Sequence, residues 1–496
     1  MSAQEPVSSP SNQYQPQSNV VPPVQQPVAA GQETVLPDVP MGKSQSEPTG
    51  TTYATPQKPS RKFPKAAIIG LVLVVLLVLV GALVTVVLPR LGSVVPQGNV
   101  ELTWWGLWEN ETLVQPLIDE YKELHPNVTI KYIHQDKQDY RERLVNEFAK
   151  GEDGTAPDIF RFHNTWVPMF INELDKLPSE VMSAEEFSQT FYPVATSDLT
   201  TGSGLAGIPL MYDGLALFIN TEIFTTYGKI PPRTWTEFSE TAKELTIVDE
   251  SGVIRQSGAA LGEAENVDHW PEILGLLMLQ NGANPANPSS DAGLQALRYF
   301  RRFRDEGIWD KTLPNSTLAF ATGRLAMYIG PSWRAFEIRE QNPNIAFQVL
   351  SVPQLPKDDP SEVDITYATY WVEGVWAKSK YTKQSWEFLK FLSSKESLQK
   401  LYDNATSQRG FGELYPRQDM KGLLEANPSV SGFIDLAPTA KSWYFASRTF
   451  DGPTGINTLV TEAYVDAVNS GSFALTAKNI VDVLVQYRLV AAPSTK

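Results

Sequence analysis

The 496-residue chain contains no cysteine and only four histidines. The absence of cysteine excludes disulfide bonds, thiolate metal sites, a cysteine nucleophile and a lipidated N-terminal cysteine. The histidines, at positions 125, 134, 163 and 269, are scattered and show no metal-ligand spacing. We therefore expect neither a bound metal nor a cofactor.

Positive charge is also scarce, because 41 lysines and arginines stand against 56 aspartates and glutamates, for a net charge of −15. This balance argues against nucleic acid or an anionic lipid surface as the main partner. The composition is otherwise that of a globular protein, with 42% hydrophobic and 20% charged residues. The length allows roughly three units of about 150 residues.

The first sixty residues have few charges and almost no aromatic side chains, and they are rich in proline, glutamine, serine and valine. A segment of this composition cannot bury enough apolar surface to offset the entropy cost of ordering it. We interpret residues 1–60 as a disordered cytoplasmic tail.

One long apolar run follows this tail. Residues 66–88 carry no charge and would extend roughly 34 Å as a helix, enough to cross a bilayer. Arg61, Lys62 and Lys65 precede the run, while only Arg90 follows it closely. This charge difference predicts a single-pass protein of the cell membrane, with a cytoplasmic N-terminus and everything after the span outside. A cleaved signal peptide is disfavoured by the long tail and the long run.

The remaining segments divide into short connections and a globular part. Residues 61–90 comprise the basic flank and the transmembrane helix, 91–98 form a linker, and 491–496 form a C-terminal tail. Between them, strand and helix patterns alternate from about Val100 onward. Such alternation implies an α/β fold in which helices cover both faces of a parallel sheet.

The local patterns predict individual elements. Asn110 is a plausible N-cap for the first helix of the globular part, and Thr234 with Glu237 forms a capping box. Strands are predicted at 100–105, 128–133, 157–162, 215–220, 325–330 and 375–379. Helices are predicted at 111–124, around Tyr140 to Phe148, and at 235–246. Another helix is predicted to end with the stretch 298–307. The last helices are predicted at 382–402, 456–469 and 476–489.

Seven segments occur in an order typical of one protein family: LTWWGLW, LIDEYKELHPNVTIKY, GTAPDIFRFH, GIPLMYDGLALFIN, PPRTWTEF, FATGRLAMYIGPSW and SWEFLKFLSSKESLQK. Through them the chain from about 99 to 490 resembles the type-1 extracellular solute-binding proteins of ABC importers, which include maltose-binding and other sugar-binding proteins. The resemblance implies a two-lobe periplasmic-binding-protein-like fold of type II with crossing hinge strands. Lobe 1 would comprise 99–213 plus 356–415, and lobe 2 would comprise 214–355 plus 416–490.

The first group of candidate ligand contacts lies where the first strand ends. Ligands of open parallel sheets bind beyond the carboxyl ends of the strands. Trp105, Trp108 and Glu109 lie there, while Trp104 is expected in the core. An indole can cover the apolar face of a sugar ring, and a carboxylate can accept hydrogen bonds from its hydroxyls. We expect at least one of Trp105 and Trp108 to face the ligand.

A second group follows the third strand and precedes the crossing strand. His163, Asn164 and Trp166 come directly after the third strand. Asn164 offers both a donor and an acceptor, whereas His163 is either a ligand contact or a histidine satisfied within the fold. Asp213 either binds sugar hydroxyls or caps the hinge. In the resemblance, its position matches an acidic sugar ligand of maltose-binding proteins.

A third group comes from the later part of the chain. Trp333 matches the position range of the family's stacking tryptophan in the second lobe. The segment that resembles the late aromatic ligand segment offers Trp443 and Tyr444. Three further candidates lie on a loop that enters a strand: Tyr370, Trp371 and Glu373.

These features predict a receptor, not an enzyme. It would bind a sugar between its lobes and deliver it by lobe closure to ABC permease subunits, while residues 66–88 contact the bilayer. A polyamine or another small solute is the main alternative, because acidic side chains and tryptophans also suit a cation. A glycoside hydrolase would need two carboxylates about 5–9.5 Å apart, and no motif marks Asp213 and Glu373 as such a pair. A sensory ectodomain that keeps the fold is a further alternative.

Overall fold

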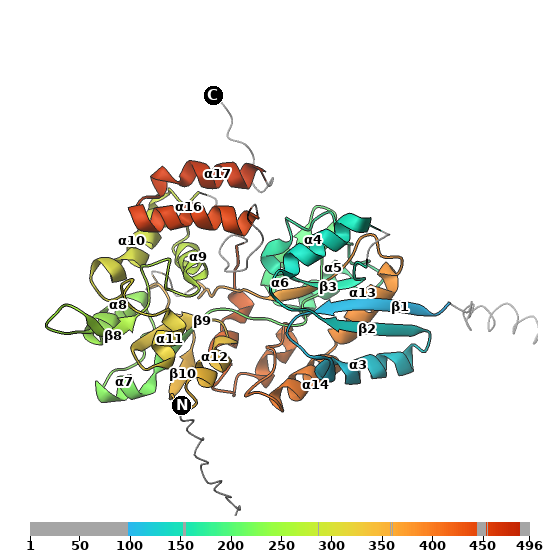
Figure 1. Cartoon of the computed structure of the whole chain (residues 1–496), viewed down its shortest axis with the longest axis horizontal. Helices are drawn as coiled ribbons and strands as arrows, with labels where there is room; N and C mark the ends of the chain where they lie inside the picture. The colour runs from blue at the N-terminus through green and yellow to red at the C-terminus, as the bar shows by residue number, and fades with distance from the viewer. Residues whose placement is uncertain are drawn as a thin grey trace, which may run out of the picture. The chain divides into compact units, whose positions relative to one another are not determined.

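Two β-sheets, each covered by helices, organise the part of the chain that the structure describes (Figure 1). This computed structural model describes residues 98–486 except 152–154, 286, 358, 360, 444–452 and 454. These residues belong to one of the two units into which the chain divides, Val94–Lys496. The predicted tail and membrane span at 66–88 lie outside the described residues. Within the described ranges, no helix is long and apolar enough to cross a bilayer.

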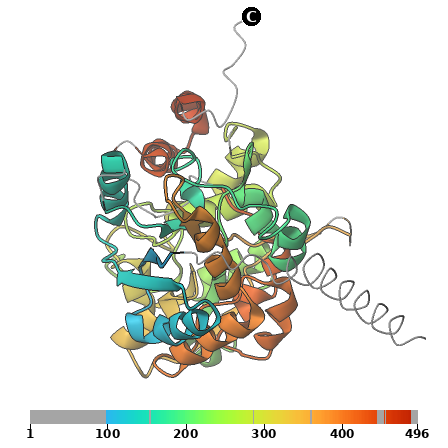
Figure 2. The same ribbon diagram turned by 90° about the vertical axis from the view of Figure 1, so that its right-hand side faces the viewer.

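Lobe 1 is the part built on the first sheet, whose strand order is β11-β3-β1-β2. The strand β1 pairs in parallel with both neighbours, and β11 joins the edge in antiparallel orientation. Its strands are β1 (Val100–Gly106), β2 (Val128–His134), β3 (Ile159–His163) and β11 (Trp371–Val375). The surrounding elements are α3 (Glu111–Leu124), α4 (Tyr140–Lys150), η3 (Asn164–Trp166), α5 (Ala184–Thr190), α6 (Pro193–Leu199), β4 (Thr200–Thr201), β5 (Gly204–Leu205), α13 (Thr382–Leu392) and α14 (Lys395–Thr406). Figure 2 looks onto this lobe, where α3 lies beside α14.

Lobe 2 is built on the second sheet, whose strand order is β10-β6-β9-β8-β7. Only β8 and β9 pair in parallel, so the expected parallel arrangement is wrong for most of this sheet. Its strands are β6 (Ala216–Asn220), β7 (Ile247–Val248), β8 (Ile254–Ala259), β9 (Leu325–Gly330) and β10 (Phe347–Leu350). Its helices are α7 (Thr221–Thr226), α8 (Trp235–Glu244), α9 (Trp270–Gln280), α10 (Asp291–Asp305), α11 (Ser316–Ala321) and α12 (Arg334–Gln341).

The last part of the chain contacts both lobes. Its elements are η4 (Gln418–Leu423), α15 (Ser431–Ile434), η5 (Ala437–Thr439), α16 (Ile456–Ser470), η6 (Phe473–Leu475) and α17 (Ala477–Gln486). The elements η4 and η5 pack on lobe 1 against α5 and α6, whereas α15 packs on strands β6 and β10 of lobe 2. The helices α16 and α17 (red in Figure 1) pack on each other, and α16 also contacts α10.

Crossing segments join the two lobes through backbone hydrogen bonds. Tyr212 N–H donates to Leu414 O at 2.8 Å, and Leu215 N–H donates to Tyr367 O at 2.9 Å. Ala368 N–H donates to Lys441 O at 2.8 Å. Four stretches that are far apart in the sequence therefore run side by side where the chain passes between its two larger sheets.

Several predicted elements are confirmed because their local signals are strong. The helix α3 spans Glu111–Leu124, and the Asn110 side chain accepts a hydrogen bond from Leu113 N–H. The helix α8 begins with the predicted capping box of Thr234 and Glu237. Two predictions are wrong. The last strand of lobe 1 is Trp371–Val375 instead of 375–379, and the helix predicted at 382–402 is two helices, because Ser394 caps a new one.

Candidate functional site

The three tryptophans after the start of β1 have different environments. Trp104 is 1% exposed and lies in the core, as expected, and Trp105 is also buried, beside Tyr140. Trp108 is 40% exposed. A Cβ atom at Gly106 would lie 2.3 Å from the Tyr132 hydroxyl, so this glycine permits a close approach of β2. The structure therefore favours Trp108 over Trp105 as the indole that is open to a ligand.

Trp108 packs on a second indole at the same end of the sheet, Trp371 at the start of the edge strand β11. Its ring and that of Trp371 meet edge to face, with centroids 5.6 Å apart. Trp371 is half-buried and also contacts His163 and Trp166. Trp166 itself is 2% exposed, so in this structure it supports Trp371 and presents almost no surface of its own.

A buried guanidinium pairs with two carboxylates that lie close in sequence to the two indoles. Arg161 on β3 donates from Nε to Glu373 Oε1 at 2.7 Å, and its Nη1 donates to Glu109 Oε2. Trp104 Nε1 donates to the other Glu373 oxygen at 3.2 Å. Burial raises the pKa of Glu373, and the positive charge of Arg161 opposes that shift. Glu373 thus lies inside β11 as part of an ion pair, which corrects its expected place on a loop.

A small hollow of about 20 Å³, enough for about one water molecule, lies beside Arg161 and Glu109. The helices α3 and α14 form two of its walls, and Leu210 of a crossing segment contributes to a third. Tyr402, Arg409, Glu413 and Tyr415 complete the polar part of its lining.

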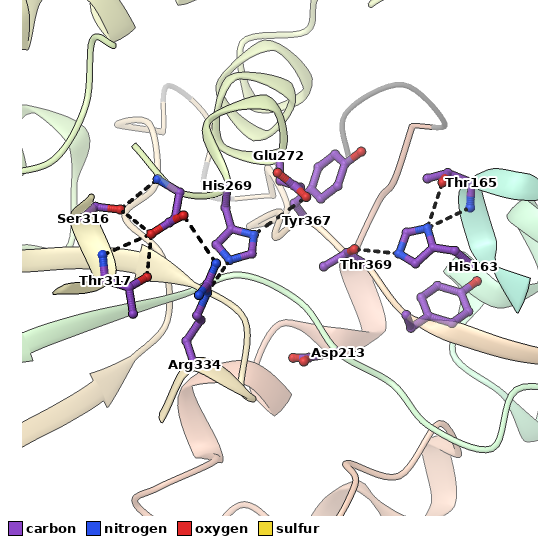
Figure 3. A network of polar contacts seen from close by, with 12 residues as sticks. His163, Thr165, Asp213, His269, Glu272, Ser316, Thr317, Arg334, Tyr367 and Thr369 are labelled. Carbon is purple, nitrogen blue, oxygen red and sulfur yellow. Dashed lines mark hydrogen bonds and ion pairs between the residues drawn. The ribbon is translucent and has the colours of Figure 1, made fainter. Parts of the chain in front are cut away.

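His163 is neutral and joins β3 to a crossing segment (Figure 3). Its Nδ1 accepts a hydrogen bond from Thr165 N–H, so Nε2 carries the proton and donates to Thr369 Oγ1 at 3.0 Å. Burial lowers the pKa of His163 to about 3. These contacts are those of a histidine satisfied within the fold.

Asn164 and Tyr370 converge on a carboxylate that the sequence did not single out. Asn164 Nδ2 and the Tyr370 hydroxyl each donate to Asp198 Oδ2 at 2.9 Å. Ser442 donates to the other oxygen at 2.5 Å. Burial raises the pKa of Asp198, and the three donors oppose the shift. This carboxylate therefore ties α6, η3, a crossing segment and the late segment together.

Asp213 holds the loop that carries Trp333. Its Oδ2 accepts from the Ser332 hydroxyl at 2.9 Å, and its Oδ1 accepts from Ser332 N–H at 3.0 Å and from Gly214 N–H at 2.8 Å. Burial raises the pKa of Asp213 to about 7, although these donors lower it. The contacts match the hinge-capping role.

Trp333 is 46% exposed and lies just before α12. The Arg334 guanidinium lies over its ring, 4.1 Å from the centroid, and His269 meets it edge to face. Trp333 and Trp108 are thus large, open aromatic side chains that each follow the carboxyl end of a strand, one in each lobe.

A polar network behind Trp333 contains residues that the sequence did not reveal as site candidates (Figure 3). Arg334 Nε donates to His269 Nε2 at 2.9 Å and pairs with Asp268 at 3.4 Å. His269 Nδ1 lies 3.8 Å from the buried Glu272 carboxylate. Arg334 could have been chosen as a site candidate, because it directly follows Trp333 in the sequence. Nothing in the sequence pointed to His269, whose backbone has a left-handed conformation (φ 60°).

The last two candidates fall at the edge of the described residues. Trp443 is half-buried, and its backbone carbonyl accepts from the Tyr367 hydroxyl at 2.7 Å. Its backbone N–H donates to the same hydroxyl at 2.9 Å. Tyr444 lies outside the described residues.

Comparison with known proteins identifies the family. The sequence model of a family described as bacterial extracellular solute-binding protein matches residues 116–411 of this chain. The chain therefore belongs to this extracytoplasmic family of binding proteins, and it is a solute-binding protein and not an enzyme. Binding proteins of Brucella abortus strain 2308 and Brucella suis biovar 1 are each 20% identical to it over 365 residues, which cover 71% of this chain and 84% of theirs.

Solved structures of sugar-binding proteins share the fold. The sugar-binding protein MalE from Xanthomonas citri has a TM-score of 0.62 at 17% identity and covers 79% of this chain and 98% of its own. A cyclo/maltodextrin-binding protein complexed with maltotetraose has a TM-score of 0.60 at 16% identity, covering 80% and 98%. The GacH receptor of Streptomyces glaucescens, solved unliganded and with acarbose, has a TM-score of 0.58 at 21% identity. Its match covers 78% of this chain and 98% of the GacH chain. These likenesses establish the two-lobe α/β fold of periplasmic binding proteins.

Proposed function

We propose that this chain is a membrane-anchored receptor that binds a carbohydrate in the cleft between its lobes and delivers it to an ABC importer. The observation that carries the proposal is the pair of open indoles, Trp108 in lobe 1 and Trp333 in lobe 2. Sugar rings present apolar C–H faces that indoles cover well, and rigid aromatic side chains lose little entropy on binding.

Lobe closure would couple binding to transport. A ligand that contacts an indole on each lobe binds the closed arrangement more tightly and so shifts the population toward it. The crossing segments are the natural hinge, since few residues pass between the two sheets. The solved relatives whose descriptions include maltotetraose and acarbose also favour a carbohydrate.

A ligand screen of the full chain in mild detergent tests the carbohydrate proposal. We expect at least one mono- or oligosaccharide to raise the thermal unfolding midpoint and to change the tryptophan fluorescence, because an indole would be covered. Polyamines belong in the same screen. A response to polyamines with none to any saccharide would replace the carbohydrate by the alternative ligand class.

Membrane anchoring through residues 66–88 is a separate part of the proposal. The absence of cysteine allows a clean topology test, because one introduced cysteine is the only thiol. A membrane-impermeant maleimide applied to intact protoplasts should label Ser251→Cys in the binding part and leave Ser46→Cys in the tail unlabelled. Deletion of 66–88 should release the protein from the membrane. The reverse labelling pattern would exclude the proposed orientation.

A further inference from the structure

Arg334 covers one face of the Trp333 ring. The central carbon of its guanidinium lies 4.1 Å from the centroid of that ring, and Arg334 itself is buried. A guanidinium over an indole is attracted to it, because the face of the ring carries partial negative charge. Trp333 nevertheless keeps 46% of its surface open. A ligand ring can therefore stack only on the face opposite Arg334.

Arg334 is fixed by contacts with three other side chains (Figure 3). Its Nε donates to His269 Nε2 at 2.9 Å, and its Nη2 lies 3.4 Å from Asp268 Oδ1. Its Nη1 pairs with Glu337, one turn further along α12. Asp268 in turn accepts from the Thr317 hydroxyl at 2.7 Å, close to the start of α11. Each guanidinium nitrogen thus has its own partner, and these partners define the plane in which the rigid group lies.

His269 supplies its acceptor from an uncommon backbone conformation. Its φ of 60° is left-handed, and among the described residues Asp139 is the only other one apart from glycine with a positive φ. Such a conformation is strained, and it persists where the surrounding structure requires it. Because an arginine can only donate, the Nε2 atom that receives its hydrogen bond carries no proton. The proton of neutral His269 is then on Nδ1, which lies 3.8 Å from Glu272 Oε1.

We propose that Arg334 and His269 are positioning residues that hold the Trp333 indole in place before the ligand arrives and present one of its faces. This inference rests on the proposed function, since it describes how the indole of lobe 2 contributes to sugar binding. Both side chains contact the ring itself, one over its face and the other edge to face. An indole that is already fixed loses little freedom on binding, so more of the contact energy contributes to affinity.

Arg334→Lys separates charge from geometry. A lysine retains the positive charge, but its ammonium cannot lie flat on the indole and contact both His269 and Asp268. The sugar found by the screen should bind about fivefold more weakly, the size expected when one more side chain must be ordered on binding. Arg339→Lys is the matched control, because Arg339 also lies in α12 with its guanidinium 4.8 Å from a ring centroid, that of Phe347. Equal losses of affinity in the two variants overturn the inference.

A double-mutant cycle shows whether Arg334 acts through the indole. In a chain that already has Trp333→Ala, Arg334→Lys should cause no further loss of affinity, because the ring that it positions is gone. A residue that merely supports the fold would weaken binding to the same extent in both chains, and that result overturns the inference. His269→Gln retains an acceptor for Arg334 and should lose less affinity than His269→Leu, which retains none. Equal losses in these two variants contradict the role of His269.

A measurement without ligand keeps this inference apart from the proposed function. The full chain is labelled with fluorotryptophan, and the fluorine resonance of Trp333 is the one that Trp333→Phe removes. Arg334→Lys should broaden this resonance or divide it, because the ring then samples several orientations, whereas Arg339→Lys should leave it unchanged. A single resonance that stays as narrow as in the unaltered chain overturns the positioning role even if sugars bind. A broadened resonance in a chain that binds no saccharide supports the positioning role and contradicts the carbohydrate proposal.

Discussion

Replacement of Trp333 by alanine tests the proposed sugar platform most directly. Trp333 is 46% exposed, and Asp213 fixes the loop that carries it through Ser332. The indole is therefore held in place by its neighbours, while nearly half of its surface is available to a ligand. Its removal should weaken ligand binding and also lower the free energy of unfolding, so both quantities are measured.

The expected size follows from the exposed area. An aromatic side chain of about 250 Å² that is 46% exposed offers about 115 Å². A sugar that covers half of this area gains about 1.5 kcal/mol at about 25 cal/mol per Å². Aromatic packing adds about 1 kcal/mol, so Trp333→Ala should weaken binding by about 2.5 kcal/mol, or roughly 60-fold. The buried part of the ring, about 135 Å², sets the folding cost at about 3 kcal/mol on the same scale, and the contact with Arg334 adds about 1 kcal/mol.

Isothermal titration with the sugar found by the screen measures this loss, and urea denaturation measures the folding cost. Tyr227→Ala is the matched control, because Tyr227 is 42% exposed and lies in lobe 2 at the end of α7. It should leave the affinity unchanged. If Trp333→Ala is folded and binds the sugar as tightly as the unaltered chain, the platform role of Trp333 is refuted.

Three further predictions concern stability and pH. Trp104→Ala should lower the free energy of unfolding in urea by about 3–5 kcal/mol because the ring is buried, whereas Trp108→Ala should mainly weaken ligand binding in titrations. Arg161→Ala should also cost about 3–5 kcal/mol, since it leaves Glu109 and Glu373 unpaired; an unchanged urea midpoint would contradict the buried network. The raised pKa of Asp213, about 7 against an ordinary value of about 3.9, means that folding favours its protonated form. This contribution is full below about pH 4 and is lost as the pH rises through about 7, so the thermal midpoint of Asp213→Asn should fall less than that of the unaltered chain between pH 5 and 8.

The elements that the sequence predicts well are those with local signals. The helix α3 has a capping residue, an apolar face of Leu113, Leu117 and Tyr121, and hence the predicted bounds. The strand β9, Leu325–Gly330, is an apolar run of six buried residues and also has the predicted bounds. Both depend on residues only a few positions apart, and a local pattern contains that information.

The strand β11 shows where local patterns fail. Its residues Trp371–Val375 are a strand because they pair with β3, more than two hundred positions earlier. The sequence pattern placed Glu373 on a loop that enters a strand, whereas the structure places it inside the strand. Its partner, Arg161, is 212 positions away, so no short window of the sequence contains both. The Asp198 contacts of Tyr370 and Ser442 were hidden for the same reason.

The carboxylates that the sequence suggested as ligand contacts, Glu109 and Asp213, are each linked to one of the two open indoles. Glu109 is bonded to Arg161 and adjoins Trp108, whereas Asp213 is bonded to Ser332, which adjoins Trp333. Each open indole thus follows or precedes a residue that is fixed by a carboxylate contact. A ring that is already held in place loses less freedom when a ligand covers it, so more of the contact energy contributes to affinity. We therefore propose that the carboxylates act on binding by fixing the loops, so their replacement by amides should weaken sugar binding less than removal of the neighbouring indoles does.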